Sequence, residues 1–220
     1  MTPPQCEIAQ QRTVRLIASA HYKPPVLRAL VDTADELAAI ERIEARTSKR
    51  LTSAPAIVTG NLDRWGQTYI AAAFTYTRPG GNRFNTAARG AWYAAFDDRT
   101  ALHEVAFHHT RELEFSNHLH DEVQYRALHA SFIGRFHDLR NSAEAAECLD
   151  PDPRVGYPAG QAVATHLIGH HSRGLVYPSV RLPGGTCLVA FQPNVVQDVA
   201  PGACWKITWN GSRQWIASAV

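Results

Sequence analysis

The sequence predicts an α+β fold on the basis of three stretches. Residues 90–96 form a short run of apolar and aromatic side chains, which is typical of a buried strand. Residues 101–114 carry apolar side chains at helical spacing. Two apolar runs, 174–181 and 186–191, are joined by a Pro-Gly-Gly turn, which predicts a β-hairpin.

The composition fits one soluble globular domain. The chain has 220 residues, of which 45% are hydrophobic and 19% charged, with a formal net charge of +2. This balance, without a basic run, gives no reason to expect direct nucleic-acid binding. No apolar stretch approaches the roughly 20 residues that a membrane helix needs, so no membrane contact is expected. Four widely separated cysteines and no recognisable signal segment indicate a cytoplasmic protein with reduced thiols.

The N-terminal third is expected to contain one strand and one long helix. Residues 1–13 are polar and predicted to be loose, and 14–18 form a short strand candidate. Apolar residues at helical spacing then predict a helix from about 27 to 44. Residues 47–66 are rich in Ser, Thr, Pro and Gly and predict a loop, whereas 71–77 alternate and predict a strand.

The C-terminal half is expected to alternate between strands and helices. We interpret residues 122–139 as a strand pair rather than a helix, because 131–136 alternate. Residues 144–149 predict a short helical turn and 157–171 a helix. Residues 192–220 predict one or two closing strands around an Asn-Gly turn.

An arginine leaves the turn that follows residue 77. Arg83 comes directly after Pro79-Gly80-Gly81-Asn82. A guanidinium offers a planar fork of donors that matches a phosphate, and glycine N–H groups can add to such an anion site. A surface ion pair explains an arginine here equally well.

The next strand and helix bring aromatic and charged side chains. Trp92 and Tyr93 should point to opposite faces, where one ring packs in the core and the other either packs or stacks on a flat ligand. Glu104, His108 and Arg111 recur at i, i+4 and i+7 on one side of the helix. They line a cleft or form a solvated, salt-bridged face.

A zinc site is not expected from the histidines. His103, Glu104 and His108 give H-E-x-x-x-H, one residue longer than the metalloprotease motif. Side chains five residues apart on a helix lie about 140° around its axis, so the two histidines face different directions.

Ser179 lies in the middle of the first apolar run of the hairpin, 174–181. It can orient Glu104 or bind a ribose hydroxyl, or it can serve only as a strand residue that satisfies backbone groups. A nucleophile is not expected because the Gly-x-Ser-x-Gly motif is absent.

Five short motifs occur in order along the chain. They are Arg15-Leu16-Ile17-x-Ser19, Gly81-Asn82-Arg83-Phe84-Asn85, Gly90-Ala91-Trp92-Tyr93, Ala101-Leu102-His103-Glu104 and Gly174-Leu175-Val176-Tyr177-Pro178-Ser179-Val180-Arg181. In order and spacing they resemble the RES domain, a family named for an arginine, a glutamate and a serine. The resemblance spans about Arg15 to Phe191, and the long N-terminal helix is similar to the larger, ParT-like branch.

The resemblance implies a fold and a division of the chain. The fold is an ADP-ribosyltransferase-like core of small antiparallel or mixed sheets flanked by helices, with an N-terminal helical extension. One RES domain would span 1–220, with a strand and helix extension at 14–50, a core at 67–192 and closing strands at 193–220.

The resemblance also implies an activity. The chain would be the toxin of a type II toxin–antitoxin pair, with NAD as substrate and no metal. It would cleave the nicotinamide–ribose bond and transfer ADP-ribose to a host protein, a nucleotide-synthesis enzyme such as phosphoribosyl pyrophosphate synthetase. A cognate antitoxin protein would occlude the active site.

Site residues follow from the positions of the motifs. The expected catalytic residues are Glu104, Arg83 and His108. The expected NAD-binding residues are Arg83, Tyr93, Ser179, Arg15 and Asn85. In this scheme Arg83 grips the pyrophosphate, Glu104 stabilises the charged sugar and Tyr93 stacks on the nicotinamide.

Three other activities stay open at the level of sequence. An NAD glycohydrolase or phosphorylase would use the same residues but pass ADP-ribose to water or phosphate. In a non-catalytic nucleotide-binding module, Glu104 would be dispensable. A metal-dependent hydrolase would rely on the histidines.

Overall fold

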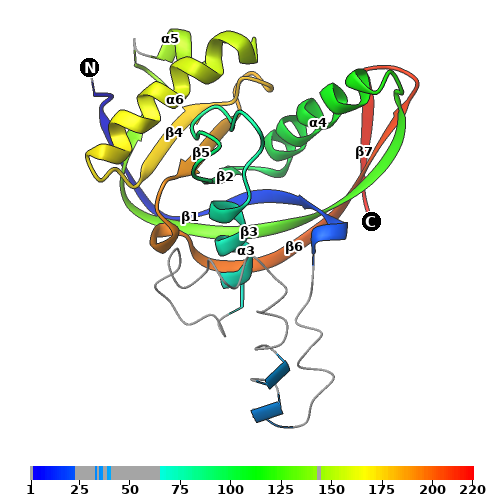
Figure 1. Ribbon diagram of the computed structural model, residues 1–220, viewed down its shortest axis with the longest axis horizontal. Helices are drawn as coiled ribbons and strands as arrows, with labels where there is room; N and C mark the ends of the chain where they lie inside the picture. Colours follow the sequence, from blue (N-terminus) through cyan, green and yellow to red (C-terminus); the bar gives the residue numbers. More distant parts are fainter. Residues whose placement is uncertain (1, 23–32, 34, 37–38, 41–64, 143–144) are drawn as a thin grey trace.

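A computed structural model describes residues 2–22, 33, 35–36, 39–40, 65–142 and 145–220 (Figure 1). The predicted helix from about 27 to 44 and the predicted loop at 47–66 lie almost entirely outside these residues. Among the described residues, no helix is both long enough and apolar enough to cross a membrane.

The fold is α+β and is built on one seven-stranded sheet. Its strands are β1 (Gln5–Ala18), β2 (Trp92–Ala95), β3 (His120–Asp138), β4 (Gly174–Pro178), β5 (Thr186–Ala190), β6 (Gln197–Asn210) and β7 (Trp215–Ala219). The order is β1-β2-β5-β4-β3-β6-β7, with β3–β4 parallel and the other neighbouring pairs antiparallel. Because β1 also pairs with β3, the first five strands in this order close on themselves.

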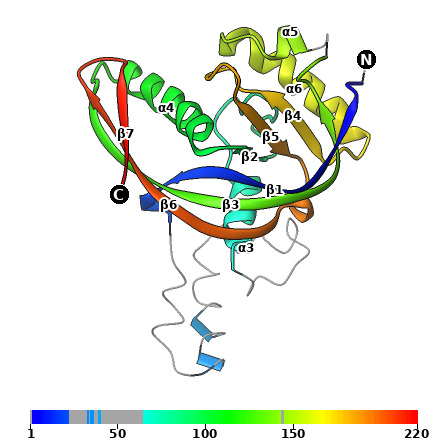
Figure 2. The ribbon, with the colours of Figure 1, turned by 180° about the vertical axis from the view of Figure 1, so that it is seen from behind.

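The helices cover the sheet from different sides. They are α3 (Gln67–Thr75), α4 (Asp98–Phe115), α5 (Ala145–Cys148) and α6 (Pro153–Gly169), with short 3-10 turns η1 (Ser19–His21) and η3 (Pro193–Val195). The long strands β1, β3 and β6 form an arc, and α4 and α6 lie above opposite ends of it (Figures 1 and 2). The β4–β5 hairpin therefore ends between two helices.

Two apolar clusters form the core, one on each side of β2. The first contains the buried faces of α4 and α6 with Leu175, Val189 and Trp209. The second contains α3 with Trp92, Phe132 and Phe136. Tyr93 packs against the first cluster whereas Trp92 belongs to the second, as expected from the alternation of side chains along a strand.

Three predictions about the elements are wrong. Residues 71–77 belong mostly to helix α3, whose alanines favour a helix and whose Ile70 and Phe74 lie one turn apart and are both buried. Residues 5–13 are not loose but extend β1, because they pair with β3. The predicted strand pair at 122–139 is a single long strand, β3, which ends at Asp138.

The other elements match their predictions. The helix predicted at 101–114 is α4, and Asp97 caps it by accepting a hydrogen bond from the Thr100 N–H at 2.7 Å. The predicted hairpin is β4–β5, and the predicted closing strands are β6 and β7.

Candidate active site

Glu104 on α4 is held by the end of the β4–β5 hairpin. Ser179 directly follows β4, and its Oγ donates a hydrogen bond of 2.7 Å to Glu104 Oε1. The same Oγ accepts from the backbone N–H groups of Arg181 and Leu182, at 3.1 and 3.0 Å. With these acceptors occupied, the single hydroxyl proton is directed at the carboxylate, so the orientation of the Ser179–Glu104 pair is fixed.

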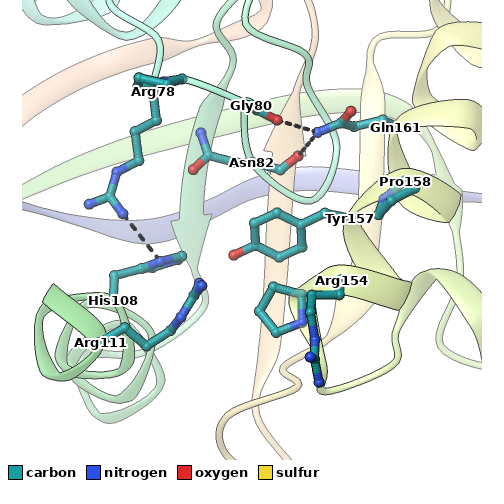
Figure 3. A pocket seen from close by; sticks show the side chains of 12 residues that line it. Arg78, Gly80, Asn82, His108, Arg111, Arg154, Tyr157, Pro158 and Gln161 are labelled. Carbon is teal, nitrogen blue, oxygen red and sulfur yellow. Dashed lines mark hydrogen bonds between the residues drawn. The ribbon is translucent and has the colours of Figure 1, made fainter. Parts of the chain in front are cut away.

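One helical turn beyond Glu104, His108 reaches an open basic cleft that lies between α4 and α6. Its volume is about 400 Å³ and Figure 3 shows its walls. The lining residues are Arg78, Pro79, Gly80, Gly81, Asn82, His108, Arg111, Pro153, Arg154, Tyr157, Pro158 and Gln161. His108 and Arg111 come from the α4 face that also carries Glu104, so part of this face lines the cleft, whereas Glu104, one turn earlier, is not among the lining residues.

The imidazole of His108 is neutral. Burial and the positive charges of Arg78, Arg181 and Arg111 lower its pKa from 6.5 to about 3. Arg78 Nη1 lies 3.5 Å from His108 Nδ1, and a guanidinium can only donate, so Nδ1 accepts and Nε2 carries the proton (Figure 3). The side chain therefore offers a neutral N–H donor rather than another cation.

The three arginines on the cleft wall differ in their partners. Arg78 pairs with Glu112 at 3.0 Å and Arg154 with Asp152 at 2.7 Å. Arg111 is exposed and makes no salt bridge within the described part of the chain, where its contact is with the Phe107 ring at 5.7 Å. It is thus the arginine on this wall that makes no ion pair with a described residue, although its charge reaches Asp152 and helps to lower the pKa of that carboxyl.

Arg83 lies behind the cleft wall rather than on it. Its side chain is 7% exposed, and Nη1 donates to the carbonyl oxygens of Cys148 and Asp150 at 2.6 and 2.9 Å. Its guanidinium lies 5.3 Å from the centre of the Tyr157 ring, which lines the cleft. The arginine therefore ties the segment before α6 to the turn at 79–85, and its contact with phosphate stays a prediction.

Arg83 and Glu104 nevertheless meet the same neighbours. The pKa of Arg181 is lowered by burial and by the positive charge of Arg83, while the negative charge of Glu104 opposes this shift. Arg181 also donates to the carbonyl oxygen of Pro151 at 2.9 Å and covers the Phe107 ring at 3.3 Å. Arg181 therefore lies within electrostatic reach of both residues, and their membership of one site stays a prediction.

Tyr93 and Asn85 are engaged within the protein. The Tyr93 hydroxyl donates to Asn85 Oδ1 and accepts from the Phe84 N–H, both at 2.9 Å. Asn85 Nδ2 donates to the carbonyl oxygens of Thr86 and Arg89. These bonds hold the turn that carries Arg83, and direct contacts of Tyr93 and Asn85 with NAD stay predictions.

Arg15 lies on the other side of the sheet. Its neighbours Val14 and Leu16 are in the first cluster, while its guanidinium lies 5.0 Å from the centre of the Trp92 ring in the second. Nη1 donates to the carbonyl oxygen of Tyr93 at 3.0 Å, and burial lowers the pKa of the guanidinium to about 10. The structure does not bring Arg15 together with Glu104.

Sequence reasoning missed the cleft residues that come from α6 and from Arg78, at the start of the Pro-Gly-Gly turn. Gln161 donates to the carbonyl oxygens of Gly80 and Asn82, both at 2.9 Å, and so fixes the turn against α6 (Figure 3). Arg78, Tyr157 and Arg154 complete the wall. Arg78 next to Pro-Gly-Gly was the available signal, whereas nothing local marked Tyr157.

No metal centre is formed by the residues that the structure describes. Within 2–22, 33, 35–36, 39–40, 65–142 and 145–220, no group of three or more His, Cys, Asp or Glu side chains is arranged to hold an ion.

The chain is thus an α+β protein with an open basic cleft between α4 and α6. The family model of the RES domain matches residues 61–210, and the chain belongs to this family. No curated protein matches the chain. It is similar to a chain in the crystal structure of the M. tuberculosis MbcT-MbcA toxin-antitoxin complex, with 20% identity over 57% of this chain and 73% of that chain and a TM-score of 0.39. That similarity is too low to say anything about activity.

Proposed function

We propose that this protein is the NAD-consuming toxin of a type II toxin–antitoxin pair. It breaks the bond between nicotinamide and ribose and transfers ADP-ribose to a host protein, an enzyme of nucleotide synthesis such as phosphoribosyl pyrophosphate synthetase. Membership of the RES family supports the substrate, and the arrangement around Glu104 supports the chemistry.

The chemistry requires a negative charge next to the sugar. When the C–N bond breaks, its electron pair leaves with nicotinamide and positive charge spreads over the ribose. A fixed carboxylate stabilises that charge, because it needs no reorganisation during the reaction. Glu104 is such a group, since Ser179 holds one of its oxygens at 2.7 Å.

The cleft provides the binding site for the pyrophosphate. Of the three arginines that line the cleft, Arg111 is the one without a salt bridge to a described residue, and a guanidinium binds phosphate oxygens in pairs. We assign the direct phosphate contact to Arg111. Arg83, the residue expected from sequence, supports the site by holding Tyr157 and the segment before α6.

One observation supports this proposal above the others: the carboxylate of Glu104 is fixed by the hairpin beside an open cleft lined by arginines. A solvated salt-bridged helix face would not place its glutamate on a buried serine hydroxyl. A nucleotide-binding module without catalysis would have no use for that contact.

The test is release of nicotinamide from NAD by the wild-type protein and by Glu104→Gln. We expect the amide to lower the rate by about 10²–10³, since one electrostatic contributor is lost. Glu114→Gln, which changes a glutamate at the far end of the same helix, is the matched control and should keep the wild-type rate. Near wild-type release by Glu104→Gln, with both variants folded, would refute the assignment.

The acceptor is tested separately, with labelled NAD and a cell lysate. Label on a discrete protein supports transfer, whereas free ADP-ribose or its phosphate supports a glycohydrolase or phosphorylase. Binding of NAD without any turnover indicates a non-catalytic module. The proposed antitoxin should prevent both binding and turnover.

A further inference from the structure

The thiol of Cys187 is buried beside Glu104. Its Sγ lies 3.7 Å from Glu104 Oε1, within reach of an S–H···O hydrogen bond. The side chain is 2% exposed, so solvent does not compete for this contact. Nothing in the proposed reaction uses this thiol so far.

The sheet fixes the position of this thiol. Cys187 lies on β5, where it is paired with Tyr177 on β4 and with Ala95 on β2. Burial and the adjacent charge of Glu104 raise the pKa of the thiol. Cys187 therefore keeps its proton and can donate it.

Two donors converge on one carboxylate oxygen. Ser179 Oγ and Cys187 Sγ both donate to Oε1 of Glu104. Within the part of the chain that the structure describes, Oε2 has no hydrogen-bond partner. The hairpin thus occupies one oxygen from two directions, which restrains rotation of the carboxylate about its terminal torsion and leaves the second oxygen available.

We propose that Cys187 is a positioning residue for Glu104. Together with Ser179 it turns the carboxylate so that Oε2 is presented to the ribose. This inference rests on the proposed function for its effect on catalysis, but the contact between thiol and carboxylate can be tested without NAD.

A plain packing role makes a different prediction for two substitutions. If Cys187 only fills space, a serine in this buried strand leaves a poorly paired hydroxyl and is as harmful as alanine or worse. If the thiol is a donor, Cys187→Ser keeps a donor at this position. Its hydrogen bond to Glu104 is weaker than that of the thiol, because the Cβ–O bond is shorter than the Cβ–S bond. The order of the two variants separates the roles.

The kinetic test is NAD cleavage by the wild type, Cys187→Ala and Cys187→Ser. We expect Cys187→Ala to lower kcat by about fivefold, the factor for one modest hydrogen bond, with the KM for NAD unchanged. Cys187→Ser should lie between alanine and wild type. Cys6→Ala, on β1 at the second cluster, should leave kcat unchanged.

The spectroscopic test needs no substrate and uses the infrared S–H stretching band. The band assigned to Cys187 by its loss in Cys187→Ala should shift in Glu104→Gln, because the acceptor changes from a carboxylate to an amide. The bands of the other cysteines should not move.

Each result decides one point. Wild-type kcat in Cys187→Ala, or alanine as active as serine, overturns the positioning role even if NAD is the substrate. If the S–H stretching band of Cys187 has the same frequency in the wild type and in Glu104→Gln, the hydrogen bond between Cys187 and Glu104 does not exist. If the wild type does not cleave NAD, the proposed function fails, and the infrared result alone then decides whether the contact exists.

Discussion

The end of the β4–β5 hairpin and the basic cleft differ in how their polar groups are bonded within the protein. At the hairpin, Ser179 uses its proton and accepts two backbone N–H groups, and Glu104 is bound through one oxygen. In the cleft, Arg111 is exposed and, among the described residues, has no salt bridge. The carboxylate at the hairpin is held in one orientation before a ligand arrives, whereas the guanidinium in the cleft is exposed and not held by an ion pair with a described residue.

The difference indicates separate roles, with the hairpin region acting on the transition state and the cleft binding the anion. A group that acts on the transition state gains from being fixed in advance, because its orientation costs nothing during the reaction. A group that captures an anion must remain accessible. Substitutions at the hairpin should therefore change kcat, and substitutions in the cleft should change KM.

The largest effect is expected at the hairpin. Ser179→Ala removes a hydrogen bond to a charged group, so we expect kcat for NAD cleavage to fall by about 10- to 100-fold with little change in KM. Ser218→Ala, an exposed serine on β7, is the control and should match the wild type. A change confined to KM would place Ser179 in substrate binding instead.

A smaller effect is expected in the cleft. Arg111→Ala should raise the KM for NAD by about tenfold, the factor expected for losing one charged phosphate contact, with kcat nearly unchanged. Arg99→Ala removes another exposed arginine of the same helix, outside the cleft, and should leave KM as it is. Equal effects of the two variants would contradict a specific phosphate site at Arg111.

The base of the cleft is tested through glycines of α6. A Cβ at Gly160 would lie 2.3 Å from the carbonyl oxygen of Arg83, whereas a Cβ at Gly169 would meet nothing within 4 Å. Gly160→Ala should therefore lower the free energy of unfolding by about 1–3 kcal/mol despite the better helix propensity of alanine. Gly169→Ala should be neutral or slightly stabilising in the same urea titration. Equal stability of both variants would show that α6 does not pack tightly on Arg83.

The last prediction concerns the pH dependence of stability. The pKa of His108 is about 3 in the fold and 6.5 ordinarily, so the unfolded chain takes up the proton first as pH falls. His108 therefore makes the free energy of unfolding decrease between pH 6.5 and pH 3 and adds nothing to the pH dependence above pH 6.5. His108→Gln should flatten that interval in urea titrations, whereas His118→Gln, at an exposed turn, should not. An unchanged slope in His108→Gln would mean that the pKa of His108 in the fold is close to its ordinary value.

Local patterns predicted those parts of the molecule whose neighbours are close in sequence. Helix α4 begins at a residue with a capping side chain and carries its apolar residues at helical spacing. The β4–β5 hairpin follows from two apolar runs around a glycine turn. The pattern failed at α3, because a helix buried on most sides lacks the polar face that marks an amphipathic one.

The candidate site also has features that local sequence patterns predicted and features that depend on tertiary packing. The sequence by itself determined that Glu104, His108 and Arg111 share a helix face, which follows from backbone periodicity, and that Ser179 lies in the first run of a hairpin. The position of Ser179 directly after β4 came from the structure. Only the tertiary structure decided that part of this helix face lines a cleft, that α6 supplies Tyr157 and Gln161, and that Arg83 supports the wall while Arg15 lies across the sheet. Those facts depend on the packing of elements far apart in the chain, which no local pattern encodes.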